Sequence, residues 1–212
     1  MRSNVLTFLS AGHETTANTL AWSVFLLSQA PDWLALVSDE ADRELNGPPD
    51  GLVERLIVTR AAVEKSLRLY PPIAALSRMN EQADQIGTHA VLPRSLFVVA
   101  PSVLHRHASL WDRPDLFDPA RFLPEAKKKT VRFAYLPFGA GPRTCIGSSF
   151  GLQEATIVLA TLVQRFDMQL LPDAEVWPCR KSRCVPPKAC RCGSCQDPSR
   201  READAWLEWF HI

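Results

Sequence analysis

The sequence has almost no net charge, because its 24 Lys and Arg residues are balanced by 23 Asp and Glu residues over 212 positions. This balance gives no general electrostatic attraction to nucleic acid or to an acidic membrane surface. The sequence also lacks internal repeats, and its first apolar run has neither the charged leader nor the small-residue cleavage site of a secretory signal. We therefore expect a cytoplasmic protein with no nucleic-acid partner.

An uninterrupted membrane-spanning segment is missing as well. The apolar run at residues 4–30, "NVLTFLSAGHETTANTLAWSVFLLSQA", is long enough to cross a bilayer. However, His13, Glu14 and several threonines interrupt it, and charged groups are costly in the hydrocarbon core. We expect no membrane span here, but a helix that is apolar nearly all round and therefore buried in a folded domain.

Cysteine is scarce in most of the chain. Cys145 is the only cysteine among the first 178 residues, and the other five lie between positions 179 and 195. After Trp177 the hydrophobic periodicity ends and the composition turns to Cys, Arg and Pro. We predict a folded domain over residues 1–177 and an atypical tail over residues 178–212 that is disordered or out of frame.

The rest of the chain reads mainly as helix. Apolar spacing and proline or glycine breaks predict helices at residues 4–30, 32–45, 52–69 and 147–166. The run "LFVVAPSVLH" (residues 96–105) predicts a short strand, and residues 108–129 form a proline-punctuated meander without periodicity. The predicted fold class is mainly α with a small β component.

The single cysteine of this domain lies in the glycine-rich stretch "PFGAGPRTCIGSSFG" (residues 137–151). A thiolate is favoured by nearby positive charge or by a helix N-terminus, and Cys145 has Arg143 before it and a predicted helix after it. Gly141 and Gly147 would let a flat cofactor approach the backbone closely. Without these neighbours, a lone cysteine is more often a small core residue.

The pattern Phe138-x-x-Gly141-x-Arg143-x-Cys145-x-Gly147 resembles the haem-thiolate signature of the cytochromes P450. The resemblance implies that Cys145 is the axial ligand to the iron of haem b (iron protoporphyrin IX), whose thiolate favours O–O cleavage. It further implies that Arg143 pairs with a haem propionate and that Phe138 shields the sulfur.

A second stretch, "AGHETT" (residues 11–16), lies midway along the first predicted helix. A carboxylate and two hydroxyls are poor choices for a buried helix interior, and a polar kink beside a water pocket is one interpretation. The stretch also looks like the oxygen-binding groove of the P450 distal helix. By that resemblance, Gly12 makes room for bound oxygen, while Glu14 and Thr15 organise proton delivery.

The third predicted helix departs from the family pattern. The segment "AAVEKSLRLYPP" resembles the P450 helix with a Glu-x-x-Arg motif, which assigns Arg68 as the arginine and puts Lys65 where the family has glutamate. In the family the glutamate joins this arginine to a second one in the meander, here Arg121. A cation beside two arginines is costly when buried. The alternative is that Glu64, four residues before Arg68, forms a compensating i,i+4 pair.

Two weaker resemblances concern further haem contacts. His105, in "LHRHASLWDRPDLFDPARFLPE", stands where family members often have a propionate partner, and Arg78 stands where many have another. A capping histidine and an exposed arginine are the ordinary interpretations of these residues.

The resemblance covers residues 2–177, which correspond to the C-terminal half of the P450 fold. We therefore expect a chain truncated at its N-terminus and frameshifted near residues 177–180, because another reading frame through the tail would restore a family-like ending. Four tail cysteines, Cys184, Cys190, Cys192 and Cys195, also suggest zinc, but their spacing is more compressed than that of two separate knuckles.

The implied function is that of a monooxygenase. It inserts one oxygen atom from O2 into a small organic substrate, using electrons from a redox partner, either a ferredoxin or a flavoprotein. Two alternatives remain: a non-catalytic remnant without stable haem, and a zinc-binding or interaction protein that works through the tail.

Overall fold

The computed structural model describes residues 2–170 and 176. Helix α1 (Arg2–Ser28) ends just before Pro31, which begins helix α2 (Pro31–Glu44) because its fixed φ suits the first helical turn. The hydroxyls inside α1 bond back to the preceding turn: Thr19 Oγ1 donates to the Thr15 carbonyl at 2.9 Å, and Ser23 Oγ to the Thr19 carbonyl at 2.8 Å. These bonds allow polar residues to lie within a helix interior.

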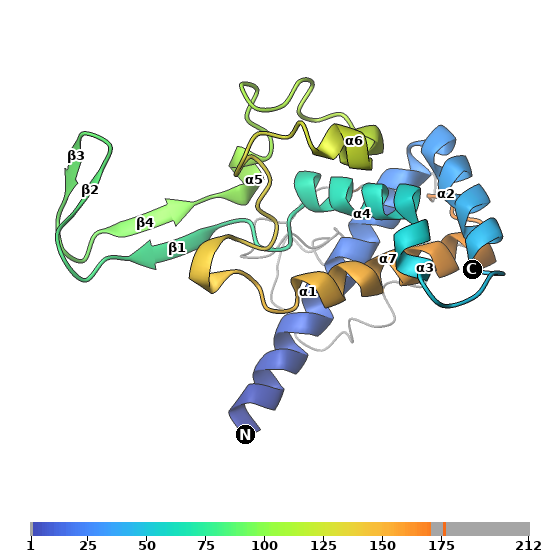
Figure 1. Ribbon diagram of the computed structural model, residues 1–212, viewed down its shortest axis with the longest axis horizontal. Helices are drawn as coiled ribbons and strands as arrows, with labels where there is room; N and C mark the ends of the chain where they lie inside the picture. The colour runs from blue at the N-terminus through green and yellow to red at the C-terminus, as the bar shows by residue number, and fades with distance from the viewer. Residues whose placement is uncertain (1, 171–175, 177–212) are drawn as a thin grey trace.

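Only the second half of α1 is buried. From Asn18 onward most side chains pack against other helices, whereas Val5, Leu6, Phe8 and Leu9 are more than half exposed. Figure 1 shows the first turns of α1 extending away from the other helices. The expectation of a helix buried along its whole length is therefore wrong for residues 4–14.

The core lies where α1, α2, α4 (Ile57–Leu69) and α7 (Ser148–Arg165) pack together (Figure 1). Trp22 is 1% exposed and stacks on Tyr70 with ring centroids 3.8 Å apart, which joins α1 to the end of α4. Burial of each large apolar side chain contributes about 2 kcal/mol. The core includes Val24, Leu27, Val37, Ala62, Val63, Leu67, Ala155, Leu159 and Val163.

The predicted helix at residues 52–69 is broken in two. Helix α3 (Leu52–Arg55) and α4 are separated by Leu56, which is fully buried and has non-helical φ and ψ of −78° and 59°. Glu40 of α2 explains this new start: its Oε1 accepts from the Val58 N–H and its Oε2 from the Thr59 N–H, each at 2.8 Å. A carboxylate from another helix thus caps α4, where the helix dipole favours negative charge.

We expect Glu40→Ala to lower the free energy of unfolding by about 3 kcal/mol, because it leaves buried N–H groups of α4 without an acceptor. Chemical denaturation of the full chain measures this change. Asp39→Asn, on the exposed side of the same helix, is the matched control and should change stability by less than about 0.5 kcal/mol. Equal losses in the two variants would contradict the capping role.

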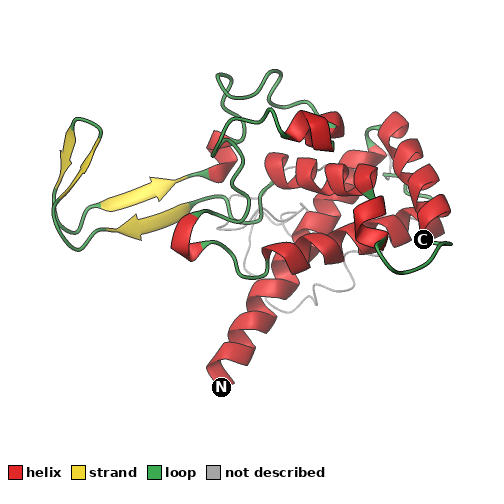
Figure 2. Ribbon diagram, in the orientation of Figure 1, coloured by secondary structure: helices red, strands yellow, loops and turns green. Residues whose placement is uncertain are grey.

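The strands form two antiparallel pairs. Strand β1 (Leu76–Met79) pairs with β4 (Leu96–Val99), and β2 (Asp84–Ile86) pairs with β3 (His89–Val91). Figure 2 shows the two pairs leading away from the helices, with β2 and β3 at the tip. The predicted strand at residues 96–105 ends early, because Pro101 begins a short helix, α5 (Pro101–Leu104).

The meander contains two short helices, η1 (Pro119–Phe122) and α6 (Pro124–Lys127). Asp118 caps η1 by accepting from the Ala120 N–H at 3.2 Å. Phe122 packs on Tyr135, with ring centroids 4.8 Å apart, and lies in one buried cluster with Trp111. These aromatic contacts fix the meander against α4.

None of the described helices is by itself long and apolar enough to cross a bilayer. The consecutive helices Asn4–Ser28 and Pro31–Glu44 are long and apolar enough only when they are counted together, and the chain bends by 117° between them.

Candidate functional site

The cysteine loop is shaped by two left-handed glycines. Gly139 has a φ of +74° and Gly141 a φ of +75°, a conformation in which a side chain would be strained. The loop doubles back through a hydrogen bond from the Cys145 N–H to the Phe138 carbonyl at 3.0 Å. It contains the short helix η2 (Gly141–Arg143), and α7 begins just after it.

The thiol of Cys145 is free and exposed, so the expectation that a lone cysteine packs in the core does not apply. A Cβ built at Gly141 would meet no atom within 4 Å, and one built at Gly147 would meet the Cys145 Sγ at 4.0 Å. A side chain at position 147 would occupy space next to the sulfur, and Gly141 borders open space. An accessible thiol on a bare glycine backbone fits a flat macrocycle with a thiolate-bound metal.

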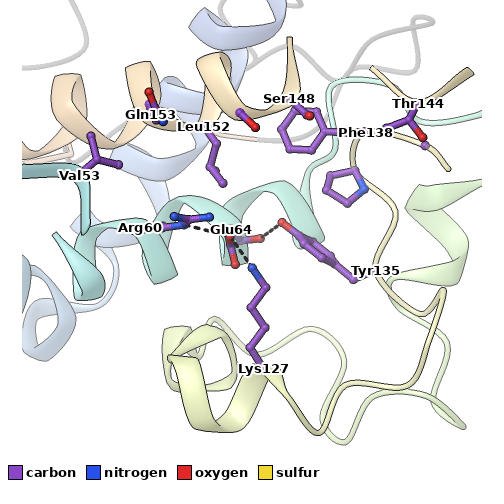
Figure 3. A pocket seen from close by; sticks show the side chains of 13 residues that line it. Val53, Arg60, Glu64, Lys127, Tyr135, Phe138, Thr144, Ser148, Leu152 and Gln153 are labelled. Carbon is purple, nitrogen blue, oxygen red and sulfur yellow. Dashed lines mark hydrogen bonds and ion pairs between the residues drawn. The ribbon is translucent and has the colours of Figure 1, made fainter. Parts of the chain in front are cut away.

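Two neighbours of Cys145, Arg143 and Phe138, differ in burial. Arg143 is exposed, as a partner for a bound anion would need to be. Phe138 is half-buried and packs against the main core, so it anchors the loop to the helices. Figure 3 shows Phe138 beside Ser148 and Leu152 of α7.

The structure brings the "AGHETT" stretch close to this loop. A Cβ built at Gly151, six residues after Cys145, would lie 3.9 Å from the Thr16 Oγ1 of α1. Gly12 is exposed, and a Cβ there would meet nothing within 4 Å. Glu14 is exposed too, while the half-buried Thr15 donates its hydroxyl to the Ala11 carbonyl at 2.7 Å. These three predicted residues therefore border open space.

Arg78 lies on the side of strand β1 that faces the cysteine loop. Leu76 Cδ1 lies 3.5 Å from a Cβ built at Gly139, and residues two apart on a strand share a face. Arg78 is exposed, and its guanidinium donates to the Ser77 carbonyl at 2.7 Å. This placement suits the predicted contact with an anionic group near the loop.

His105 has a different role from the one expected. It is fully buried; its Nδ1 lies 3.2 Å from the Arg68 carbonyl, and its Nε2 accepts from the Leu136 N–H at 2.8 Å. Burial lowers the pKa of His105 to about 4, so the ring is neutral with its proton on Nδ1. Both nitrogens are used within the protein. The expectation of a propionate contact is corrected: His105 ties α4 to the segment that leads into the cysteine loop.

Arg68 joins the same region through two backbone groups. Its guanidinium donates to the carbonyls of His105 and Pro114, and lies 4.9 Å from the centroid of the Trp111 ring. Burial, and then the charge of Arg121, lowers the pKa of Arg68 to about 10. Arg121 donates to Asp118 Oδ2 at 3.1 Å and to the Asp112 carbonyl.

Lys65 produces the conflict that the sequence predicts. Its side chain is fully buried, and its Nζ has no hydrogen-bond partner among the described residues. Burial, together with the charges of Arg68 and Arg121, lowers the pKa of Lys65 to about 7. An ordinarily charged amine is thus held next to two guanidinium groups.

Glu64 does not compensate for Lys65. The expected i,i+4 pair with Arg68 is not formed, because Glu64 Oε1 contacts Lys127 Nζ at 2.8 Å and Arg60 Nε at 3.4 Å. Tyr135 donates its hydroxyl to the Glu64 carbonyl at 3.0 Å. Figure 3 shows these groups in a cleft of about 450 Å³ bounded by α4, α6, α7 and the cysteine loop.

Tyr135 and Lys127 could not be predicted as site residues from the sequence, since neither lies in a recognisable motif. Glu64 is a candidate from the sequence, but two of its partners, Lys127 and Tyr135, are 63 and 71 residues away. Among the described residues, no group of three or more His, Cys, Asp or Glu side chains could hold a metal ion. The four tail cysteines considered for zinc, and the domain boundary at Trp177, lie outside the described residues.

The comparison with known proteins extends over most of the chain. The family model for cytochrome P450 matches residues 1–190. Cyclooctatin synthase of Streptomyces melanosporofaciens is 41% identical over 180 residues, which cover 84% of this chain and 39% of that protein. Pentalenene oxygenase of Streptomyces avermitilis is 35% identical over 181 residues, which cover 84% and 40%. The chain thus spans about 40% of the length of these relatives.

Solved structures give the same answer for the fold. The haem domain of cytochrome P450DA superimposes with a TM-score of 0.80 at 34% identity, over 86% of this chain and 41% of that one. Cytochrome P450 CYP102L1 superimposes with a TM-score of 0.79 at 30% identity, over 86% and 42%. The helices and small sheets therefore form part of the P450 fold, and the chain belongs to the cytochrome P450 family.

Proposed function

We propose that this chain supplies the haem-thiolate part of a monooxygenase that inserts one oxygen atom from O2 into a small organic substrate. The observation that carries the proposal is the exposed Cys145 thiol, held in a loop of left-handed glycines just before α7, whose Gly151 approaches Thr16 of the "AGHETT" stretch on α1. Haem b is the cofactor that we propose, held within residues 1–177. When bound, it supplies oxygen activation that a thiolate ligand promotes.

The side chains around the thiol have separate proposed roles. Cys145 binds the iron, and the exposed guanidinium groups of Arg143 and Arg78 pair with the propionates. On α1, Gly12 leaves room for oxygen beside the helix, and Glu14 takes up protons from solvent. Thr15 then transfers these protons, since its hydroxyl can turn from the Ala11 carbonyl, to which it now donates, toward another acceptor in the site.

The overall reaction needs partners. One oxygen atom enters the substrate and the other leaves as water, so two electrons and two protons are consumed. We propose that a ferredoxin or flavoprotein supplies the electrons and that the reaction takes place in the cytoplasm. Two relatives are named for oxidation of pentalenene and of cyclooctat-9-en-7-ol, and we propose an organic substrate of that kind.

Reconstitution with haem tests this proposal. We expect the reduced full-length chain, exposed to carbon monoxide, to show the red-shifted Soret band of a thiolate-bound haem. Cys145→Ser should abolish that band, because the hydroxyl does not replace the thiolate, whereas Cys190→Ser should leave it unchanged. A band that survives in Cys145→Ser would contradict the assigned ligand.

The same measurement separates a second candidate, a non-catalytic family member without stable haem. The buried conflict between Lys65 and two arginines favours this candidate, because Arg68 and His105 fix the segment that leads into the cysteine loop. A chain that folds, as judged by circular dichroism, but takes up no haem would support it over the monooxygenase.

A further inference from the structure

Three buried hydrogen-bond donors in one part of the molecule have no acceptor among the described residues. They are Lys65 Nζ, Arg68 Nε and Trp111 Nε1, and all three residues are at most 6% exposed. A buried donor without an acceptor is unfavourable, and native structures seldom contain several of them together. Such a set indicates that an acceptor belongs among them.

Two of the donors, Lys65 and Arg68, lie on one face of α4, and the third, Trp111, lies in the segment after α5. Ala61, Lys65 and Arg68 are spaced i, i+4 and i+7, which places them in a row along the helix. Trp111 packs in the same buried cluster as Ala61, at one end of this row, and lies 4.9 Å below the guanidinium carbon of Arg68 at the other end. Lys65 lies between Ala61 and Arg68 in this row on α4.

The charges in this region are also unbalanced. Arg121 pairs with Asp118 at 3.1 Å, and Arg106 with Asp115 at 2.6 Å. Arg68 bonds only uncharged backbone carbonyls in the contacts described above.

Lys65 has no carboxylate within ion-pair distance among the described residues. Its neighbour Glu64 is engaged elsewhere, by Arg60 and Lys127. Neither Lys65 Nζ nor Arg68 Nε therefore has an acceptor among the described residues, although the charges of Asp118 and Asp115 favour the charged forms of Lys65 and Arg68.

We infer that a small monovalent anion binds among Lys65 Nζ, Arg68 Nε and Trp111 Nε1. The two cationic donors supply charge-assisted hydrogen bonds, and the indole N–H supplies a neutral one. A halide or a small carboxylate meets this donor set, since each carries one negative charge and donates nothing. The bound anion balances Lys65, whose pKa of about 7 reflects its present surroundings. The site does not depend on haem or on the proposed reaction.

Thermal unfolding of the full chain at constant ionic strength tests the site. Chloride, and in a second series formate, replaces a bulky organosulfonate too large for a buried cluster. We expect Tm to rise by roughly 3–5 °C at a concentration about tenfold above Kd. If formate acts and chloride does not, the ligand is a carboxylate; the reverse result identifies a halide.

Two variants assign the effect to this cluster. Lys65→Met removes the central donor and should abolish the rise in Tm, while Lys128→Met, at an exposed lysine, should retain it. No rise in the wild type, or an equal rise in Lys65→Met, would overturn the inference.

A measurement that does not require Lys65→Met covers the case in which that variant does not fold. Chloride-35 exchange with a protein site broadens its resonance, and formate should reverse that broadening if both anions compete for the cluster. Trp111→Phe, which keeps the ring but removes the N–H, should weaken chloride binding several-fold. Broadening that is absent, or that Trp111→Phe leaves unchanged, would contradict the site.

Discussion

Lys65→Glu should raise the free energy of unfolding by about 3 kcal/mol at pH 7, although it introduces a charge into the interior. The new carboxylate would lie where Lys65 Nζ now lacks a partner, beside the guanidinium groups of Arg68 and Arg121. It would accept from the unpartnered Arg68 Nε and replace a repulsion by an attraction. Haem retention by the reconstituted chain should improve as well, because Arg68 and His105 hold the segment next to the cysteine loop.

Chemical denaturation in halide-free buffer measures this effect. Lys65→Met is the matched comparison: it removes the buried cation without adding an anion, so its gain in stability should be smaller than that of Lys65→Glu. Lys128→Glu, at an exposed position, should change stability by less than about 1 kcal/mol. If Lys65→Glu proves no more stable than Lys65→Met, the carboxylate does not reach the two arginines.

Most of the helices could be predicted, because a helix is indicated by the spacing of its own apolar residues. The helix boundaries could not, because they depend on contacts with distant residues. Periodicity over residues 52–69 suggested one helix, but Glu40, far away in sequence, caps a new start after Leu56. A signal was present: Glu40 lies next to Ala41 and three residues after Val37, on the buried face of its helix. A carboxylate on the buried face of a helix indicates a hydrogen-bond donor inside the fold.

The apolar first helix shows a limit of hydropathy. Its composition predicts burial, but it cannot say which turns other helices will cover, and in the fold they cover α1 only from Thr15 onward.

The site could be predicted where a role rests on local sequence, and not where it rests on tertiary contacts. The cysteine loop follows from its own glycines and the next helix: Gly139 and Gly141 have the positive φ values that favour glycine, and α7 begins just after the loop. His105 could not be assigned in this way, because both its partners, the Arg68 carbonyl and the Leu136 N–H, lie more than 30 residues away. Lys65 is an intermediate case, since a motif comparison locates the conflict but only the fold shows that Glu64 points elsewhere.

We expect the free energy of unfolding to increase as the solution becomes alkaline. Lys65 has a pKa of about 7 in the folded protein and an ordinary value of 10.5 when unfolded. Between these values the unfolded chain binds a proton that the folded chain does not, so the free energy of unfolding rises with pH. The contribution is least favourable below pH 7 and is complete above pH 10.5. Over pH 7.5–9.5 we expect a gain of about 2 kcal/mol in halide-free buffer.

Denaturation curves at several pH values measure this slope, and the shifted pKa values of His105 and Arg68, about 4 and about 10, lie outside the window. Lys65→Met should remove the slope, while Lys128→Met should keep it. Saturating chloride or formate should also reduce it, because a bound anion favours the charged amine and raises its pKa. A slope that persists in Lys65→Met would show that another group titrates. The slope could also disappear in Lys65→Met but stay unchanged when chloride or formate is added. That result would show that Lys65 is the titrating group and that no anion binds beside it.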